Sequence, residues 1–461
     1  MASIYVNAYF TIVSADAKRT DAGLTGIGPH RPREMPYRQF HFGPGTTMFQ
    51  VDPILHDAKS KYFTRGWTYQ EWILSPRRLV FHNQTVTWMC QEIIVEESGH
   101  EHVKSFLPDV WLPTYLDGEE AELIWTRWPN LYAYLTTIER YSMRELSFSE
   151  DVLNAFEAFI TVQGRAMKGG MLHGLPELFF GSTLLWLPET GTSRRTDEHG
   201  NVLRQFPSWS WVGWVGQVHM NMTATVTNYV SRQDYVGGTF VDQPIIDFYK
   251  ITGQLEDHVP RTKELIRDLH HYAKVDQYDQ DTLLPCFEND YQGFTQNVPL
   301  LGQPETASLS LTSAPTVFIE FKTTRLFASL TVSPCIQHNL EQYPYIIDAA
   351  GAIVGYMDLT AGELPPIQAS VELICIGLVK VTGMTCSEMG FRAAGCFHSQ
   401  CPARCSFDTG SCKLEPDWEF SFYNVLWVEW EDGVAYRKAI GKVWAVHWDT
   451  TPTEEVVVLL G

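Results

Sequence analysis

Residues 65–92 read RGWTYQEWILSPRRLVFHNQTVTWMCQE, and this stretch holds the densest local pattern of the chain. Residues 67–74 are helical in pattern, and Pro76 ends the helix because proline cannot continue one. Residues 79–81 and 86–88 alternate around a polar turn, which predicts a β-hairpin. The stretch therefore predicts a helix that is followed at once by two antiparallel strands.

The residues before this stretch predict a short helix and one strand. Residues 1–8 carry apolar positions on one helical face, and residues 11–14 (TIVS) are strand-like. Residues 17–60 are irregular and rich in glycine, proline and histidine, which predicts a long loop.

The middle of the chain predicts two amphipathic helices within residues 119–168. Their apolar faces are Leu131, Tyr134, Leu135, Ile138 and Tyr141 for the first, and Val152, Ala155, Phe156, Phe159 and Ile160 for the second. The spacing Ser147…Glu150 is that of a capping box, which predicts that the second helix begins there.

After about residue 180 the pattern changes to strands. The strand-like segments are 184–188, 207–216, 317–321, 325–332, 371–381 and a C-terminal hairpin that turns at Asp432-Gly433. Within 207–216 we expect Trp209 and Trp211 to share one strand face. The polar stretch 254–285 predicts one helix, at 263–275.

These elements predict a mixed, α+β chain with an α/β N-terminal region, a helical middle and a predominantly β C-terminal half. We expect three parts, 1–95, 96–180 and 181–461, the last with a polar insertion near 254–285.

Charge and composition narrow the classes of function. The net charge of -20 disfavours nucleic acid as a partner. No apolar run reaches the roughly 18 residues that a membrane helix needs. The N-terminus has no basic segment before its apolar stretch, so it is a poor signal peptide. We therefore expect a cytoplasmic protein with reduced cysteines.

The motifs of residues 65–92 resemble the last block of the fungal heterokaryon incompatibility (HET) domain. That block runs Arg-x-Trp-Thr-x-Gln-Glu, then Leu-Ser-Pro-Arg, then a strand carrying Phe, and ends in Trp-x-Cys. The residues that match here are Arg65, Trp67, Thr68, Gln70, Glu71, Leu74, Ser75, Pro76, Arg77, Phe81, Trp88 and Cys90. The opening MASIYVNAYFTIVSADA is similar to the family's stretch before this block.

Further motifs follow in the family's order: residues 141–159, then GLPELFF, PSWSW and the C-terminal strands. The resemblance touches most of the chain except about 225–310 and 385–415. The family's opening motifs, Leu-Ser-Tyr-x-Trp-Gly, Trp-Ile-Asp and Cys-x-x-Gln, have no counterpart. We therefore expect a chain that lacks the N-terminal half of the HET domain.

The resemblance also implies a distant likeness to TIR domains, which use one carboxylate to cleave the glycosidic bond of NAD. It implies a partial TIR-like fold for the N-terminal region, with Glu71 as catalytic residue and with Trp67 and Arg65 binding nucleotide. On a helix, Trp67 and Glu71 share a face because they are four residues apart. The alternative is structural: Glu71 pairs with Arg65 or Arg77, and Trp67 is core. No cofactor is expected, and NAD enters only as a substrate.

Two other groups of residues invite a binding role. Arg65, Arg77 and Arg78 are candidate phosphate ligands, with surface charge or pairing to Glu71 and Asp52 as the alternative. The segment 396–412 holds Cys396, His398, Cys401, Cys405 and Cys412. Their gaps are irregular for structural zinc, so we predict no metal and leave the question open for these cysteines.

The resemblance implies a HET-type protein of fungal self/non-self recognition and programmed cell death. Such a chain would be a signalling or interaction module with protein partners, and a homo-oligomer is left open. The alternative is a TIR-like NAD glycohydrolase that uses Glu71, or an inactive truncated paralogue of one. We expect no enzymatic activity for the chain as written.

Overall fold

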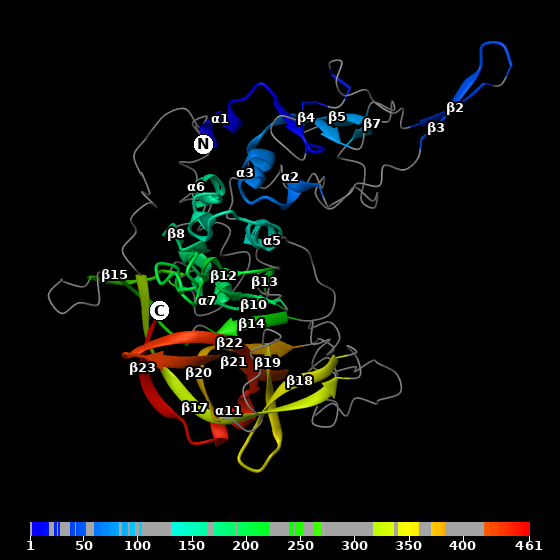
Figure 1. Ribbon diagram of the computed structural model, residues 1–461. Helices are drawn as coiled ribbons and strands as arrows, with labels where there is room; N and C mark the ends of the chain where they lie inside the picture. Colours follow the sequence, from blue (N-terminus) through cyan, green and yellow to red (C-terminus); the bar gives the residue numbers. More distant parts are fainter. Residues whose placement is uncertain are drawn as a thin grey trace. The chain divides into compact units, whose positions relative to one another are not determined.

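The protein is described by a computed structural model. The described residues are 2–17, 23–24, 26–27, 37–41, 43–51, 60–82, 85–90, 93–96, 101–103, 131–164, 167, 169–189, 191–220, 239–243, 245–252, 262–268, 271, 317–335, 340–358, 370–382 and 419–461. The chain forms two compact units (Figure 1). The N-terminal unit holds residues 1–128, 143–166 and 291–311, and the C-terminal unit holds 129–142, 167–290 and 312–461.

The N-terminal unit contains a five-stranded sheet of order β1-β4-β5-β6-β7. Its strands are β1 (Thr11–Ser14), β4 (Arg77–His82), β5 (Thr85–Cys90), β6 (Ile93–Glu96) and β7 (Glu101–Val103). β1 pairs with β4 in parallel, and the other neighbours are antiparallel. Parallel neighbours need a crossover, and the helices between them supply it. The strand predicted at 11–14 and the hairpin predicted after Pro76 are confirmed.

Helix α3 (Trp67–Leu74) contacts β4 through its side chains, and α1 (Ala2–Val6), α2 (Lys61–Thr64) and α6 (Glu157–Gly164) pack against α3. A 3-10 turn, η2 (Ser149–Val152), comes before α6. The guanidinium of Arg78, on β4, lies over the ring of Trp72, on α3, at 4.4 Å from the centre of that ring. The Trp72 ring also packs edge-on against the ring of Phe63. The predicted bounds of the helix at 67–74 are confirmed.

Two predictions fail in this unit. Residues 17–60 include a hairpin, β2 (Tyr37–His41) with β3 (Thr47–Val51), where a loop was expected. The hairpin turns through Gly43 and Gly45, which both have positive φ. Glycines that suggested a loop therefore form the turn of a hairpin, where their freedom to adopt positive φ is needed. The capping box is also wrong. Phe148 is extended, Ser147 is exposed, and the chain makes a 3-10 turn before α6 begins at Glu157.

In the C-terminal unit, helix α5 (Leu131–Ser142) buries the five residues of its predicted apolar face. Shorter elements follow: β8 (Met171–Leu172), β9 (Leu175–Pro176), η3 (Glu177–Phe179), α7 (Phe180–Thr183), β10 (Trp186–Pro188), β11 (Ser193–Arg194), η4 (Trp211–Gly213), β12 (Trp214–Val215) and β13 (Val218–Met220).

The strand predicted at 207–216 is confirmed only at β12, Trp214–Val215; a turn and the 3-10 helix η4 take the place of the rest. The Ser210 hydroxyl accepts the N–H of Val212 and so caps η4. Trp209 and Trp211 are both buried, as core residues should be, but they share no strand face. A local hydrogen bond from the backbone to the Ser210 side chain stabilises the 3-10 turn here, in place of the backbone pairing that a strand would need.

The large sheet of this unit has ten strands. They are β14 (Thr239–Gln243), β15 (Tyr249–Thr252), β16 (Thr262–Leu265), β17 (Val317–Cys335), β18 (Leu340–Ile347), β19 (Ile353–Asp358), β20 (Ser370–Thr382), β21 (Glu419–Glu431), β22 (Val434–Trp444) and β23 (Glu454–Leu460). β17 pairs with both β18 and β20, so the path β17-β18-β19-β22-β21-β20 closes on itself (Figure 1). The predicted C-terminal hairpin is confirmed, with Asp432 and Gly433 at positive φ.

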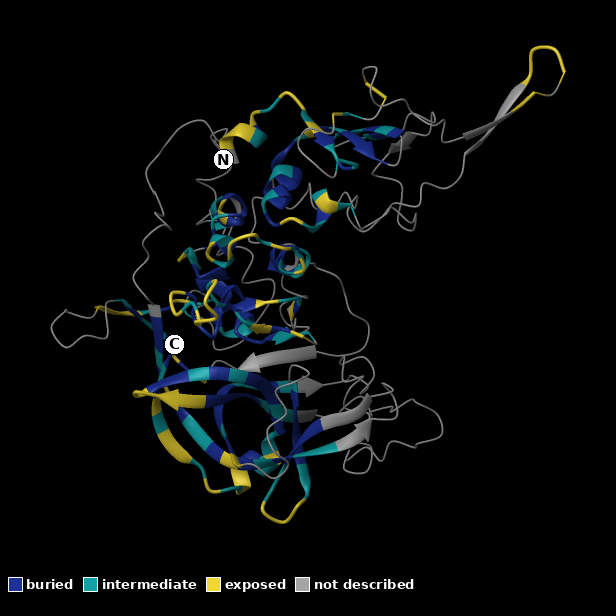
Figure 2. Cartoon of the chain, in the orientation of Figure 1, coloured by how far each residue is buried: buried dark blue, intermediate teal, exposed yellow. Residues whose placement is uncertain are grey.

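A helix was predicted at 263–275, but residues 262–265 form β16 and pair with β15. The two segments predicted at 317–321 and 325–332 are one strand, β17, which spans 19 residues. Buried apolar side chains from all six strands of the closed path make one core, together with Trp448 of α11 (Ala445–Thr450). Figure 2 shows these strands as largely buried, with bands of intermediate burial between the buried stretches.

Candidate functional site

Glu71 lies on α3 and is hydrogen-bonded to Tyr5 of α1. Both side chains are partly buried. The two residues are brought together because α1 packs on α3, so the pair joins elements 66 positions apart. The phenol donates, and the carboxylate accepts.

Burial is the main influence on Glu71, and it raises the pKa of the carboxyl. The hydrogen bond from Tyr5 and the positive charge of Arg65 act in the opposite direction. The pKa of Tyr5 is raised to about 12, first by burial and then by the negative charge of Glu71. At neutral pH the phenol therefore keeps its proton and remains a donor.

The other two predicted site residues lie on either side of the start of α3. Arg65 ends α2, is exposed, and contributes its charge to Glu71 from there. Trp67 is the first residue of α3 and is half-buried. Helical spacing puts Trp67 and Glu71 on the same face of α3.

Arg77 and Arg78 contact residues other than Glu71. The Arg77 guanidinium lies 5.5 Å from the centre of the Tyr9 ring and donates to the Tyr9 carbonyl oxygen. Arg78 is buried, stacks on Trp72 and donates to the Trp72 carbonyl oxygen. Of the three arginines considered from the sequence, Arg65 is the one whose charge lowers the pKa of Glu71. Asp52 lies outside the described residues.

Sequence patterns alone missed two tyrosines beside Glu71, Tyr5 and Tyr62. The Tyr62 hydroxyl is buried and has no hydrogen-bond partner among the described residues. Burial raises the pKa of Tyr62, and the charge of Glu71 raises it further, while Arg144 and Arg78 lower it. No spacing in the sequence links these residues, because they come from three separate elements.

The comparison with known families bears on this part of the chain. Residues 1–71 match the family model described as Heterokaryon incompatibility protein (HET). The HET match runs from α1 into α3 and ends at Glu71, so it includes every residue of the Tyr5–Glu71–Arg65 cluster. It confirms the resemblance for this segment. No curated protein and no solved structure matches the chain.

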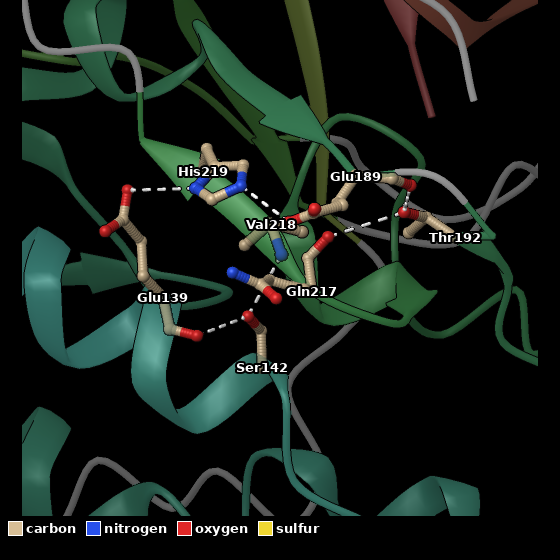
Figure 3. A network of polar contacts seen from close by, with 7 residues as sticks. All are labelled: Glu139, Ser142, Glu189, Thr192, Gln217, Val218 and His219. Carbon is tan, nitrogen blue, oxygen red and sulfur yellow. Dashed lines mark hydrogen bonds and ion pairs between the residues drawn. The ribbon is translucent and has the colours of Figure 1, made fainter. Parts of the chain in front are cut away.

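A second polar network lies in the C-terminal unit (Figure 3). The His219 ring stands between two carboxylates, with Nε2 2.6 Å from Glu189 and Nδ1 3.9 Å from Glu139. The Ser142 hydroxyl accepts the N–H of Val218, 3.0 Å away, and ties α5 to β13. Each carboxylate contacts a different nitrogen of the His219 ring, so the three side chains do not converge on one point as metal ligands would. The contacts instead hold neighbouring elements of this unit together.

Within the described part of the chain, no group of three or more His, Cys, Asp or Glu side chains is arranged to hold a metal ion. Cys396, Cys401, Cys405 and Cys412 lie outside the described residues. Among the helices of the described part, none is both long enough and apolar enough to cross a membrane.

Proposed function

We propose that this chain is a signalling or interaction module of fungal self/non-self recognition, in which heterokaryon incompatibility leads to programmed cell death. The observation that carries the proposal is the HET match over residues 1–71. A cytoplasmic location, protein partners and the three-part division at 95 and 180 belong to the same proposal. The closed sheet of the C-terminal unit would then be a scaffold or sensor.

Inducible expression in a filamentous fungus tests this function. We expect growth arrest or death of cells that express the chain, scored by colony growth and vital-dye uptake. A variant such as Leu74→Asp, which buries a charge in α3, should unfold the matched unit and abolish the response. Normal growth with abundant folded protein, in the presence and absence of an incompatible partner strain, would refute the proposal.

A second function is favoured by the Tyr5–Glu71–Arg65 cluster: cleavage of NAD in the manner of TIR domains. In this reaction the bond between ribose C1′ and the nicotinamide nitrogen breaks, nicotinamide leaves with the bonding electrons, and water adds to C1′ and releases a proton. A half-buried carboxylate is suited to stabilise the positive charge that develops on the ribose. Tyr5 would hold the carboxylate in place, and Arg65 and Trp67 would contact the nucleotide.

The purified chain, incubated with NAD, tests this second function. This second function predicts release of nicotinamide and ADP-ribose, and a loss of at least about a hundredfold in rate for Glu71→Gln. Glu150→Gln is the matched control, because Glu150 is an exposed glutamate of the same unit. No NAD loss from folded protein, or equal rates for the Glu71 and Glu150 variants, would exclude Glu71 as a catalytic residue.

A further inference from the structure

A short segment of the N-terminal unit, residues 143–146, lies against the turn that joins α2 to α3. The backbone N–H of Glu145 donates to the carbonyl oxygen of Thr64 at 2.6 Å. The carbonyl oxygen of Glu145 accepts the N–H of Gly66 at 2.8 Å. Glu145 is thereby paired with Arg65 as in a parallel β-bridge. These two hydrogen bonds hold the extended backbone of Arg65, the residue that follows α2.

The side chain of Arg144 reaches the same turn. One guanidinium nitrogen, Nη1, donates to the carbonyl oxygen of Arg65 at 3.2 Å and to the hydroxyl of Thr68 at 3.4 Å. The guanidinium also lies over the ring of Tyr69, 4.4 Å from the centre of that ring. The Thr68 hydroxyl in turn donates to the Arg65 carbonyl oxygen at 2.9 Å. Two side chains, from different segments of the unit, therefore hold the carbonyl group of Arg65.

The groups that influence Glu71 come from the helices on either side of this turn. Burial raises the pKa of Glu71, and the hydrogen bond from Tyr5 of α1 and the positive charge of Arg65 lower it. Tyr62 of α2 is a further neighbour, because the charges of Glu71 and Arg144 both act on the pKa of its phenol. The effect of Arg144 on Glu71 therefore passes through the turn at Arg65.

We propose that Arg144 is a positioning residue of the Glu71 site: it holds the turn so that the positive charge of Arg65 acts on the Glu71 carboxylate. The turn needs such support, because Arg65 is exposed and the four residues of α2 form too short a helix to be stable alone. Arg144 lies beyond residues 1–71, which the HET family model matches, so a later segment completes the site. The inference rests on the proposed role of Glu71 in NAD cleavage, but its test does not need activity.

A carbon-13 NMR titration of the Glu71 carboxyl in the full chain tests this role, with the signal assigned by its loss in Glu71→Gln. Arg144→Met keeps an apolar stem and loses the guanidinium. We expect the pKa of Glu71 to rise in this variant, because the charge of Arg65 is no longer held in place. Arg144→Lys should reverse most of that rise, since a single nitrogen makes both hydrogen bonds and an ammonium also binds over an aromatic ring.

A double-mutant cycle tests whether Arg144 acts through Arg65. Arg65→Met should raise the pKa of Glu71 at least as much as Arg144→Met does. Adding Arg144→Met to Arg65→Met should change the titration no further. Glu145→Gln is the matched control, because it removes the exposed ion pair with Lys61 and keeps the backbone hydrogen bonds to the turn. This control should leave the titration of Glu71 unchanged.

Two results would overturn the proposal. One is an unchanged titration of Glu71 in Arg144→Met that circular dichroism shows to be folded. The other is a rise of the same size when Arg144→Met is added to the Arg65→Met chain. Should Arg144→Met fail to fold, Thr68→Val decides, because it removes the hydroxyl that accepts from Arg144 and donates to Arg65. The pKa of Glu71 should rise there too, and an unchanged value would overturn the proposal.

NAD cleavage is measured separately on the same variants, so the two proposals can fail independently. The expected rise in the pKa of Glu71, in a chain that does not cleave NAD, would refute the proposed enzyme and keep Arg144 as a positioning residue. Cleavage of NAD by a chain in which Arg144→Met leaves the Glu71 titration unchanged would do the reverse.

Discussion

The guanidinium of Arg437 lies 3.8 Å from the centre of the Trp186 ring and donates hydrogen bonds to the carbonyl oxygens of Leu184, at 2.7 Å, and Trp186. Arg437 is only 2% exposed. Burial lowers its pKa to about 9, against the attraction of Asp358. The contact fastens β22 of the closed sheet to Leu184 and to the first residue of β10. The planar guanidinium geometry allows one side chain to reach both carbonyls.

Replacing Arg437 should therefore destabilise the C-terminal unit. We expect Arg437→Met to lose about 2 to 4 kcal/mol, because two buried carbonyl groups lose their donors. Arg437→Lys should lose nearly as much, since an ammonium cannot repeat the planar fork. Urea unfolding followed by tryptophan fluorescence gives the difference. Lys438→Met, at the next position, should change stability by less than about 0.5 kcal/mol, and similar losses at both positions would contradict the role of Arg437.

Gly174 lies in the β8–β9 turn, and we predict that a larger residue at this position destabilises the C-terminal unit. Its φ is +77°, and an added Cβ would lie 2.9 Å from the Trp211 ring. Its carbonyl accepts hydrogen bonds from Tyr134 and Trp211. Gly174→Ala should lower the free energy of unfolding by about 3 kcal/mol, from backbone strain and from the clash with the ring.

Gly351 provides the control for that comparison. Its φ is +81°, but nothing lies within 4 Å of an added Cβ. Gly351→Ala should lose only the strain of a left-handed backbone, about 1 kcal/mol. The difference between the two melting temperatures measures the close approach to Trp211. Equal decreases in melting temperature for the two variants would show that backbone strain alone accounts for the loss of stability at both glycines.

His173 should make stability depend on pH. Its ring is buried against Trp209, and neither ring nitrogen has a hydrogen-bond partner among the described residues. Burial lowers the pKa of His173 from 6.5 to about 4. The unfolded chain binds the proton first, so the stability present above pH 6.5 is lost as the pH falls toward 4, by about 3 kcal/mol.

The measurement is urea unfolding at a series of pH values between 4 and 7. His173→Asn should flatten this dependence, because asparagine tolerates the positive φ of 44° and does not titrate. His199→Asn is the control, since His199 is exposed. A pH dependence that survives in the His173 variant would assign it to other groups.

Tyr5→Phe should raise the pKa of Glu71 further. The hydrogen bond from Tyr5 is one of two influences that lower that pKa, and its removal leaves burial opposed only by Arg65. A carbon-13 NMR titration of the Glu71 carboxyl measures the change. The lost hydrogen bond should also reduce stability by about 1 kcal/mol. Tyr9→Phe, at an exposed tyrosine of the same segment, should leave the titration unchanged.

The direction of the effect of Glu71 on stability follows from its raised pKa. The carboxyl contributes stability that is fully present below its unfolded value of 4.5 and is lost as the pH rises through the folded value. Glu71→Gln should remove this dependence and leave the chain at least as stable at neutral pH. A loss of stability confined to neutral pH in this variant would show that the charged form is the one the fold stabilises.

The sequence predicted the candidate site only as a set of neighbours along the chain. Arg65, Trp67 and Glu71 could be grouped because helical spacing and a recurrent motif fall on the same seven residues. Tyr5 could not be added, since its distance along the chain from Glu71 carries no periodic signal. The pairing of β1 with β4, and of β4 with β5, likewise needs strand register, which the apolar content of single strands does not specify.

Local patterns by themselves determined the elements whose signals are short-range: the helix at 67–74, the strand at 11–14, the face of α5 and the turn at Asp432-Gly433. Only the tertiary structure decided that 262–265 is a strand, that 211–213 form a 3-10 turn, and that β17 closes the sheet on β20. These outcomes depend on partners far away in the sequence, whose hydrogen bonds and packing override local propensity.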